Sequence, residues 1–182
     1  MKNVLHQAAA HGDVDVIRRL LAYDLDVNLT DADGNTALNV AIGEEHHECA
    51  IALIRGGADV NVNAGGIFSN PLHVAIIRQN VELVEALLEA GAKLNMTDQF
   101  GNSALHLLMN IFNKGVHSCR RIFDLLVAKR IDLNQSNYNQ WCPLHIAVRN
   151  GQYDAVKASL KHNLKQLSGT PNPGVNVFDL NI

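Results

Sequence analysis

The chain has 182 residues, of which 47% are hydrophobic and only 5% aromatic, and its 15 basic and 18 acidic side chains give a net charge of −3. This balance leaves no excess of lysine and arginine to hold a phosphate backbone, which argues against nucleic acid as a partner. No apolar run reaches the roughly 18 to 20 residues of a membrane span, so we expect a cytoplasmic or nuclear protein without membrane insertion. Three widely spaced cysteines without a CxxC motif indicate reduced thiols.

The first predicted elements are two short helices near the N-terminus. The first begins at Leu5, and the second runs from Val14 to Tyr23. Arg18 and Arg19 fall on the solvated face of the second helix. Its apolar residues recur at the spacing of the opposite face and are expected to point inward; they are Val16, Ile17, Leu20 and Leu21.

A hairpin and a second helix pair follow. Gly34 supplies the turn of the hairpin, and the neighbouring Asp31 and Thr36 side chains suit hydrogen bonds to local backbone groups. A glycine then arrives early, in the segment Gly43 to Glu45, so we expect an irregular junction between these two helices.

The clearest helix pair lies between Asn70 and Asn95, in the stretch NPLHVAIIRQNVELVEALLEAGAKLN. Pro71 suits the start of a short first helix. Leucine and valine residues then recur with the 3.6-residue period of a second, amphipathic helix, which Gly91 ends. The pattern predicts a helix-turn-helix unit followed by a loop.

This pattern recurs along the chain. An anchor leucine stands at Leu5, Leu38, Leu72, Leu105 and Leu144, with separations of 33, 34, 33 and 39 residues. The third unit resembles the ankyrin repeat signature through Pro71, Leu72, His73, Ala75, Leu87, Leu88, Gly91, Ala92 and Asn95. The resemblance implies an all-α repeat solenoid, an ankyrin repeat array of about five helix-turn-helix units joined by hairpin loops. We place the ankyrin repeat domain at residues 1–163, with units at approximately 1–30, 31–63, 64–97, 98–136 and 137–163.

Three units depart from the signature. The third has AGGIF within Asn63 to Ser69, so its hairpin tip is expected to be rebuilt. The fourth is longer: we expect five added residues around Asn113 to Ser118 and another near Lys129 to Ile131. The fifth has Ser159 where a buried leucine is expected, which predicts a weakly packed second helix.

Residues 164–182 form a C-terminal tail. Its first part holds Gly169, Pro171, Pro173 and Gly174, which break helices. Asp179 to Asn181 then resembles the end of the fourth unit. The tail is either the start of a further repeat or a C-terminal cap, and a natural stop codon directly after Ile182 would argue against a further repeat.

Two groups of side chains have the chemistry of metal ligands. His6, His73, His106 and His145 each follow an anchor leucine, where the resemblance implies a hydrogen bond to neighbouring backbone, and at this period they lie too far apart to share one ion. The run from Glu44 to Cys49 lacks the HExxH order. No nucleophile, base and electrophilic group converge, so the sequence predicts no enzymatic activity, no metal and no cofactor.

The resemblance implies a protein-protein interaction module, a scaffold or adaptor, that binds another protein or peptide on a concave face of hairpin tips and first helices. Two alternatives stay open: a targeting domain of a larger enzyme, channel or ubiquitin-ligase adaptor, and an autonomous effector or inhibitor. We expect a monomer.

The partner-binding residues implied by the resemblance lie at the hairpin tips and at the exposed end of each first helix. They are Asp33, Asn35, Glu44, Ile67, Phe68, Ile77, Arg78, Phe100, Asn102, Asn110, Ile111, Tyr138, Asn139, Trp141 and Arg149. The aromatic residues and arginines among them suit the centre of an interface. The alternative is that the aromatic residues pack on neighbouring tips within the chain.

A modification site is a further expectation. Asn61 ends the stretch LIRGGADVN, which resembles substrates of asparaginyl hydroxylation in some ankyrin proteins. The alternative is structural, because asparagine suits hydrogen bonds in such turns.

Overall fold

The computed structural model describes residues 4–23, 25–62, 70–112 and 117–167. Within these ranges the chain forms ten α-helices. Their bounds are α1 Val4–His11, α2 Val14–Leu21, α3 Ala37–Gly43, α4 His47–Arg55, α5 Pro71–Ile77, α6 Val81–Glu89, α7 Ala104–Ile111, α8 His117–Ala128, α9 Pro143–Arg149 and α10 Tyr153–Leu167. The last helix extends through 164–167, which the sequence assigned to the tail.

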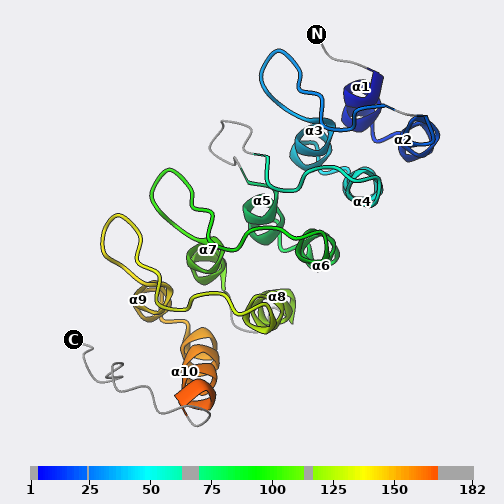
Figure 1. The fold of residues 1–182 in the computed structure, drawn as a ribbon. Helices are drawn as coiled ribbons and strands as arrows, with labels where there is room; N and C mark the ends of the chain where they lie inside the picture. The colour runs from blue at the N-terminus through cyan, green and yellow to red at the C-terminus, as the bar shows by residue number, and fades with distance from the viewer. Residues whose placement is uncertain (1–3, 24, 63–69, 113–116, 168–182) are drawn as a thin grey trace.

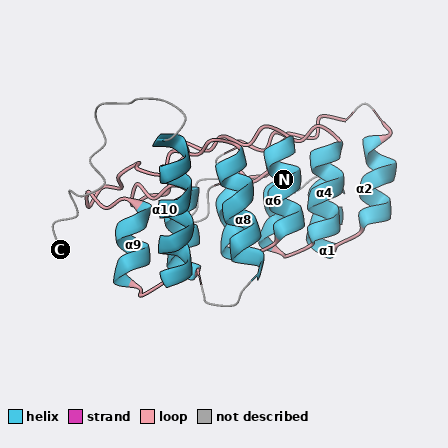
Figure 2. Ribbon diagram, turned by 90° about the horizontal axis from the view of Figure 1, so that it is seen from below, coloured by secondary structure: helices cyan, strands magenta, loops and turns pink. Residues whose placement is uncertain are grey.

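The helices form two parallel rows. Helices α1, α3, α5, α7 and α9 stack in one row, and α2, α4, α6 and α8 stack in the other (Figure 1). Seen from below, the second helices stand side by side (Figure 2). The described hairpins project beyond the first row, on the side away from the second (Figure 1). This arrangement confirms the predicted solenoid of about five helix-turn-helix units.

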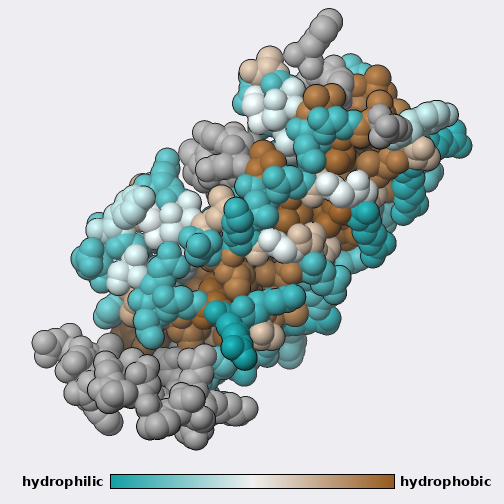
Figure 3. Space-filling view, viewed as in Figure 1, coloured by the Kyte–Doolittle hydropathy of each residue, from teal (hydrophilic) through white to brown (hydrophobic). Residues whose placement is uncertain are grey.

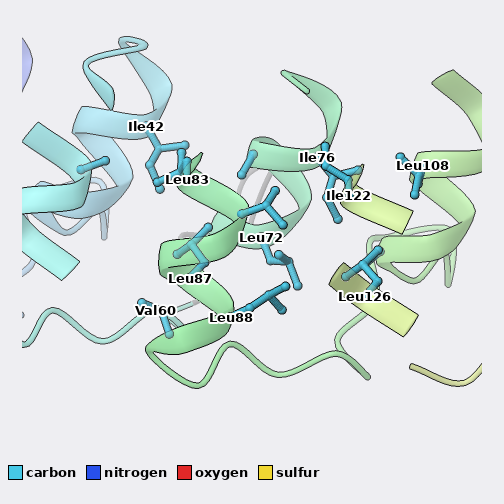
Figure 4. Close-up of a cluster of buried hydrophobic side chains, with 14 of the residues drawn as sticks. Ile42, Val60, Leu72, Ile76, Leu83, Leu87, Leu88, Leu108, Ile122 and Leu126 are labelled. Atoms are coloured by element: carbon cyan, nitrogen blue, oxygen red, sulfur yellow. The ribbon is translucent and has the colours of Figure 1, made fainter. Parts of the chain in front are cut away.

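The core runs along the array between the two rows. The anchor leucines Leu38, Leu72 and Leu105 are at most 1% exposed, because each is covered by the helices of the next unit. Leu72 lies among side chains of its own and neighbouring units (Figure 4). A band of hydrophobic residues follows the same line in the space-filling view (Figure 3). Burial of leucine between closely packed helices is therefore the main stabilising contribution.

One prediction about the first unit was wrong. Val16 was expected to point inward but is 38% exposed, whereas Ile17 is fully buried. Leu20 and Leu21 are half-buried, and Arg18 is exposed as predicted. Within its own row α2 packs closely against α4 alone, whereas α4 lies between α2 and α6. The buried face of α2 is therefore narrower, and Val16 falls outside it.

The junctions inside the units are more uniform than the sequence indicates. Each of four first helices ends at a residue in the left-handed region: Gly12 (φ 75°), Glu45 (φ 62°), Gln79 (φ 55°) and Gly151 (φ 63°). The early Gly43 lies within α3, so the irregular junction predicted there was wrong. Glu45 takes the left-handed conformation instead, at a cost of about 1 kcal/mol relative to glycine.

The extra residues of the fourth unit lie before the end of α8. The carbonyls of Leu53, Leu87 and Leu126 each accept an N–H from the residue five positions later, so the three leucines are equivalent. Leu126 follows its anchor by 21 residues, against 15 in the two preceding units. The insertion predicted near residues 129–131 was therefore wrong: Arg130 (φ 61°) takes the left-handed place of the expected glycine.

Part of the insertion lengthens a helix. Helix α8 has 12 residues, whereas α4 and α6 have 9 each. The segment predicted to hold the added residues, Asn113 to Ser118, overlaps the start of α8, and its residues 113–116 lie outside the described ranges. Part of the inserted sequence therefore lies in the second row of helices, on the side away from the hairpins.

Histidines that follow the anchor leucines join neighbouring units. His6 Nε2 donates to the carbonyl of Asn35 at 2.8 Å, and His106 Nε2 donates to the carbonyl of Trp141 at 2.8 Å. The Nδ1 of His106 accepts the backbone N–H of Ser103 at 3.1 Å, which caps α7. The hydrogen-bonding role predicted for these two histidines is confirmed.

His145 differs from these two histidines. Its Nδ1 accepts the N–H of Cys142 at 3.0 Å, but its ring is exposed. In the two earlier units, the carbonyl that accepts the hydrogen bond from the histidine Nε2 belongs to the unit that follows. Within the part of the chain that the structure describes, the Nε2 of His145 has no hydrogen-bond partner.

The stability of the array should fall as the pH drops below 6.5. His73 and His106 are 3% and 0% exposed, and burial lowers the pKa of both from the ordinary value of 6.5. The unfolded chain then binds more protons than the folded chain between the ordinary and the lowered pKa. Stability is therefore complete above 6.5 and is lost as the pH falls through that window. Urea denaturation at about pH 7.5 and about pH 5.5 measures the loss.

The matched variant replaces both histidines by asparagine. Asn39 already caps the equivalent helix, because its Oδ1 accepts the N–H of Thr36 at 3.2 Å. His73→Asn with His106→Asn should therefore keep the caps while flattening the pH dependence. The same loss of stability in the double variant as in the wild type would contradict the assignment.

Candidate functional site

One acceptor side chain shapes each described hairpin tip. Asp31 Oδ1 accepts the N–H groups of Asp33 at 3.0 Å and Asn35 at 2.9 Å. These hydrogen bonds stabilise the carboxylate and hold the pKa of Asp31 below its ordinary value, and the bond from the Asn35 N–H has the largest effect. Asp98 and Asn137 accept two N–H groups in the same way in the fourth and fifth units. The tips therefore have fixed shapes.

The hairpins of the fourth and fifth units are bonded to each other. Asn137 Nδ2 donates to Asn102 Oδ1 at 2.8 Å, and the Tyr138 N–H donates to the Phe100 carbonyl at 3.1 Å. The close approach of the two hairpins depends on Gly101 (φ 78°), because a Cβ at this position would lie 2.6 Å from the Tyr138 ring. The two tips form one platform that leaves Phe100 and Tyr138 57% and 73% exposed.

A hollow of about 420 Å³ opens between this platform and helices α7 and α9. Arg149 lies over the ring of Trp141, with its Cζ 4.9 Å from the ring centroid. Trp141 is half-buried and packs against the core with its remaining surface. The residues that line the hollow are Phe100, Asn102, Asn110, Asn137, Asn139, Trp141, Ile146 and Arg149.

The structure brings together six of the fifteen partner-binding residues predicted from the sequence: Phe100, Asn102, Asn110, Asn139, Trp141 and Arg149. Sequence reasoning missed Asn137 and Ile146. Asn137 stands seven residues before its anchor leucine, as Asp31 and Asp98 do, so the spacing offered a signal for it. Ile146 is buried and carried no such signal.

Other predicted residues lie away from the hollow. Asp33 and Glu44 are exposed in the second unit, whereas Asn35 is half-buried beside His6. Tyr138 stands on the rim of the platform.

The remaining predicted residues are partly occupied or lie outside the described ranges. Ile77 is half-buried, and Ile111 packs against the core. Arg78 forms an ion pair with Glu45, so its charge is already matched. The predictions for residues 67 and 68 lie outside the described ranges.

The histidine and cysteine side chains have structural surroundings. Cys142 Sγ lies 3.2 Å from His145 Nδ1, at the helix start where Thr36 and Ser103 stand in other units. Burial raises the pKa of the Cys49 thiol, which keeps it protonated and unreactive. Across the described ranges, no three His, Cys, Asp or Glu side chains gather closely enough to hold a metal ion. No helix there combines the length and apolar character that crossing a bilayer requires.

Comparison with known proteins places these features in a family. The family model "Ankyrin repeats (3 copies)" matches residues 72–166, and "Ankyrin repeats (many copies)" matches residues 5–54. The first match alone covers more than half of the chain.

Three relatives illustrate the range of proteins to which the chain is similar. It is 32% identical over 141 residues to the ankyrin repeat protein YahD of Escherichia coli (strain K12), covering 78% of this chain and 67% of YahD. It is 37% identical over 111 residues to the nuclear factor NF-kappa-B p105 subunit of Gallus gallus, covering 58% and 11%. It is 33% identical over 152 residues to ankyrin repeat and SOCS box protein 16 of Homo sapiens, covering 81% and 33%.

The chain thus spans about two thirds of YahD and a third or less of the other two relatives. The matched segments contain the stacked helix pairs, the anchor leucines and the hairpins described above. The chain belongs to the ankyrin repeat family.

Proposed function

We propose that the chain is a non-enzymatic protein-protein interaction module, a scaffold or adaptor, that holds a partner on the concave face of its hairpin tips and first helices. The observation that carries this proposal is the hollow between the fourth and fifth units, which the exposed Phe100 helps to line, beside a platform that also exposes Tyr138. Ankyrin repeats in general bind proteins. The proposal adds which part of the face does so, and it places the module inside the cell as a monomer.

The platform suits tight binding because it is held in place before a partner arrives. Two hydrogen bonds join its hairpins, and acceptor side chains fix each tip. The backbone that carries Phe100 and Tyr138 therefore loses little freedom on binding, and aromatic side chains dominate interface energetics.

A second candidate function is favoured by the lengths of the relatives. Two of them are far longer than the segment to which this chain corresponds. The chain could accordingly serve as the targeting domain of a larger enzyme, channel or ubiquitin-ligase adaptor, or as an autonomous effector or inhibitor. All of these functions use the same concave face.

Affinity capture from a cell lysate, followed by mass spectrometry, tests the proposal when three proteins are compared. The wild type should retain a partner that the double variant Phe100→Ala, Tyr138→Ala loses. The control is Tyr23→Ala, which removes a 71% exposed aromatic residue after α2 and should leave capture unchanged. Equal capture by all three proteins would count against the concave face.

We also propose Asn61 as a site of asparaginyl hydroxylation. Its side chain is engaged in the folded chain: Oδ1 accepts the Lys93 N–H at 2.8 Å, and Nδ2 donates to the Gly91 carbonyl at 3.3 Å. A hydroxylase would have to detach this link between units. Coexpression with the hydroxylase should add the mass of one oxygen atom to the wild type and none to Asn61→Gln. An unshifted wild-type mass would end the proposal.

A further inference from the structure

Arg149 exposes a positive charge to the hollow that no carboxylate of the described residues balances. Among the described residues, Arg18, Arg78, Arg120 and Arg121 form ion pairs, whereas no carboxylate lies within ion-pair distance of Arg149. None of the eight residues that line the hollow is acidic. An unbalanced cation in a concave site favours the approach of an anionic group.

The guanidinium of Arg149 is held in one orientation. It lies over the Trp141 ring at 4.9 Å, and its Nε donates to Asn150 Oδ1 at 3.4 Å. The backbone of Trp141 is fixed in turn, because its backbone N–H donates to Asn137 Oδ1 at 3.0 Å and its carbonyl accepts from His106, and the half-buried ring packs against the core. The terminal N–H groups of the guanidinium stay available for both oxygens of a carboxylate.

The rest of the hollow suits a polypeptide backbone. The side chains of Asn110 and Asn139 make no hydrogen bond to other described residues, and each amide offers both donors and an acceptor to peptide groups. Phe100 adds apolar surface to the lining, and the platform beside the hollow exposes Tyr138. The volume, about 420 Å³, lies near the lower end of the roughly 300 to 1,000 Å³ of ligand pockets, which suits a short extended segment.

The charges on the other described units differ from that of the fifth. In the second unit the exposed side chains Asp33 and Glu44 are acidic. In the third unit Arg78 is already paired with Glu45. An acidic group on a partner is therefore favoured at the fifth unit and not at the second or third.

We propose that the hollow takes an extended peptide segment whose aspartate or glutamate side chain pairs with Arg149. The apolar neighbour of that acidic residue lies against Phe100 and Tyr138. This inference rests on the proposed function and adds the chemistry of the partner to it.

A phage-displayed library of random linear peptides tests the proposal by selection on the wild type and on Arg149→Glu. The wild type should enrich peptides with Asp or Glu at one fixed position beside an apolar residue, and Arg149→Glu should enrich Lys or Arg at that position. A synthetic peptide from the wild-type selection should bind Arg149→Gln about tenfold more weakly. Arg19→Glu, which makes the same charge change on the exposed face of α2, should keep the wild-type preference.

The outcomes separate this inference from the proposed function. Enriched peptides that depend on Phe100 and Tyr138 but show no acidic preference would overturn the inference and leave the proposed function standing. If peptides selected on Arg149→Glu still prefer an acidic residue, the inference is also overturned and the proposed function stands. If no peptide depends on Phe100 and Tyr138, the proposed function fails together with the inference. Arg149 is exposed, so thermal melting of each variant should match the wild type and exclude a folding defect.

Discussion

Replacing Leu72 by alanine is expected to lower the free energy of unfolding by about 3 kcal/mol, the middle of the range for a leucine truncated in a core. Leu72 is 0% exposed and lies in α5, which contacts helices of the second, third and fourth units. Its removal leaves a cavity at the centre of the array, where the helices on both sides hold the space open. Urea denaturation followed by circular dichroism measures the loss.

Leu144→Ala is the matched control. Leu144 is the anchor leucine of the fifth unit but is only half-buried, because no described unit covers it from the C-terminal side. The same chemical change should therefore cost less than half as much as Leu72→Ala. Equal losses at the two positions would show that burial between units does not set the stability.

Replacing Trp141 by alanine is expected to weaken partner binding by about 2 kcal/mol, roughly thirtyfold, as for a central interface residue. The change removes the ring over which Arg149 is held, so the guanidinium gains freedom that binding must again restrict. The backbone bonds of Trp141 to His106 and Asn137 remain. Isothermal titration with a partner obtained by affinity capture measures the effect.

Trp141 is half-buried, so its removal should also cost about 1 kcal/mol of stability through lost packing. The two effects separate in Arg149→Ala, which should weaken binding while the melting temperature stays near that of the wild type. A large fall in melting temperature for Trp141→Ala with unchanged binding would show that the indole serves only as packing within the chain.

The fold was predictable because leucines repeat in phase with several other residue types. Anchor leucines such as Leu38 and Leu105 are buried where the pattern places them. The register of α8 was not predictable, because Leu125, Leu126 and Val127 allow more than one alignment. Packing between units selects Leu126, which a single sequence does not reveal.

The left-handed residues were missed for a related reason. Sequence reasoning assigns this conformation to glycine, whereas Glu45, Gln79 and Arg130 adopt it because helices on both sides fix the chain direction. In the candidate site, the position of Trp141 relative to its anchor was predictable. The ion pair between Arg78 and Glu45 was not, since it depends on how two units stack.

The histidine bonds give the array a direction that limits its symmetry. In His106 and His145 the Nδ1 accepts a backbone N–H, so the tautomer is fixed with the proton on Nε2. Each such histidine is a donor on the face toward the next unit, and the complementary carbonyl lies on the opposite face, as that of Trp141 does. The histidine bond therefore repeats only in one direction along the described units, from each unit to the one that follows, and a two-fold axis would interrupt it.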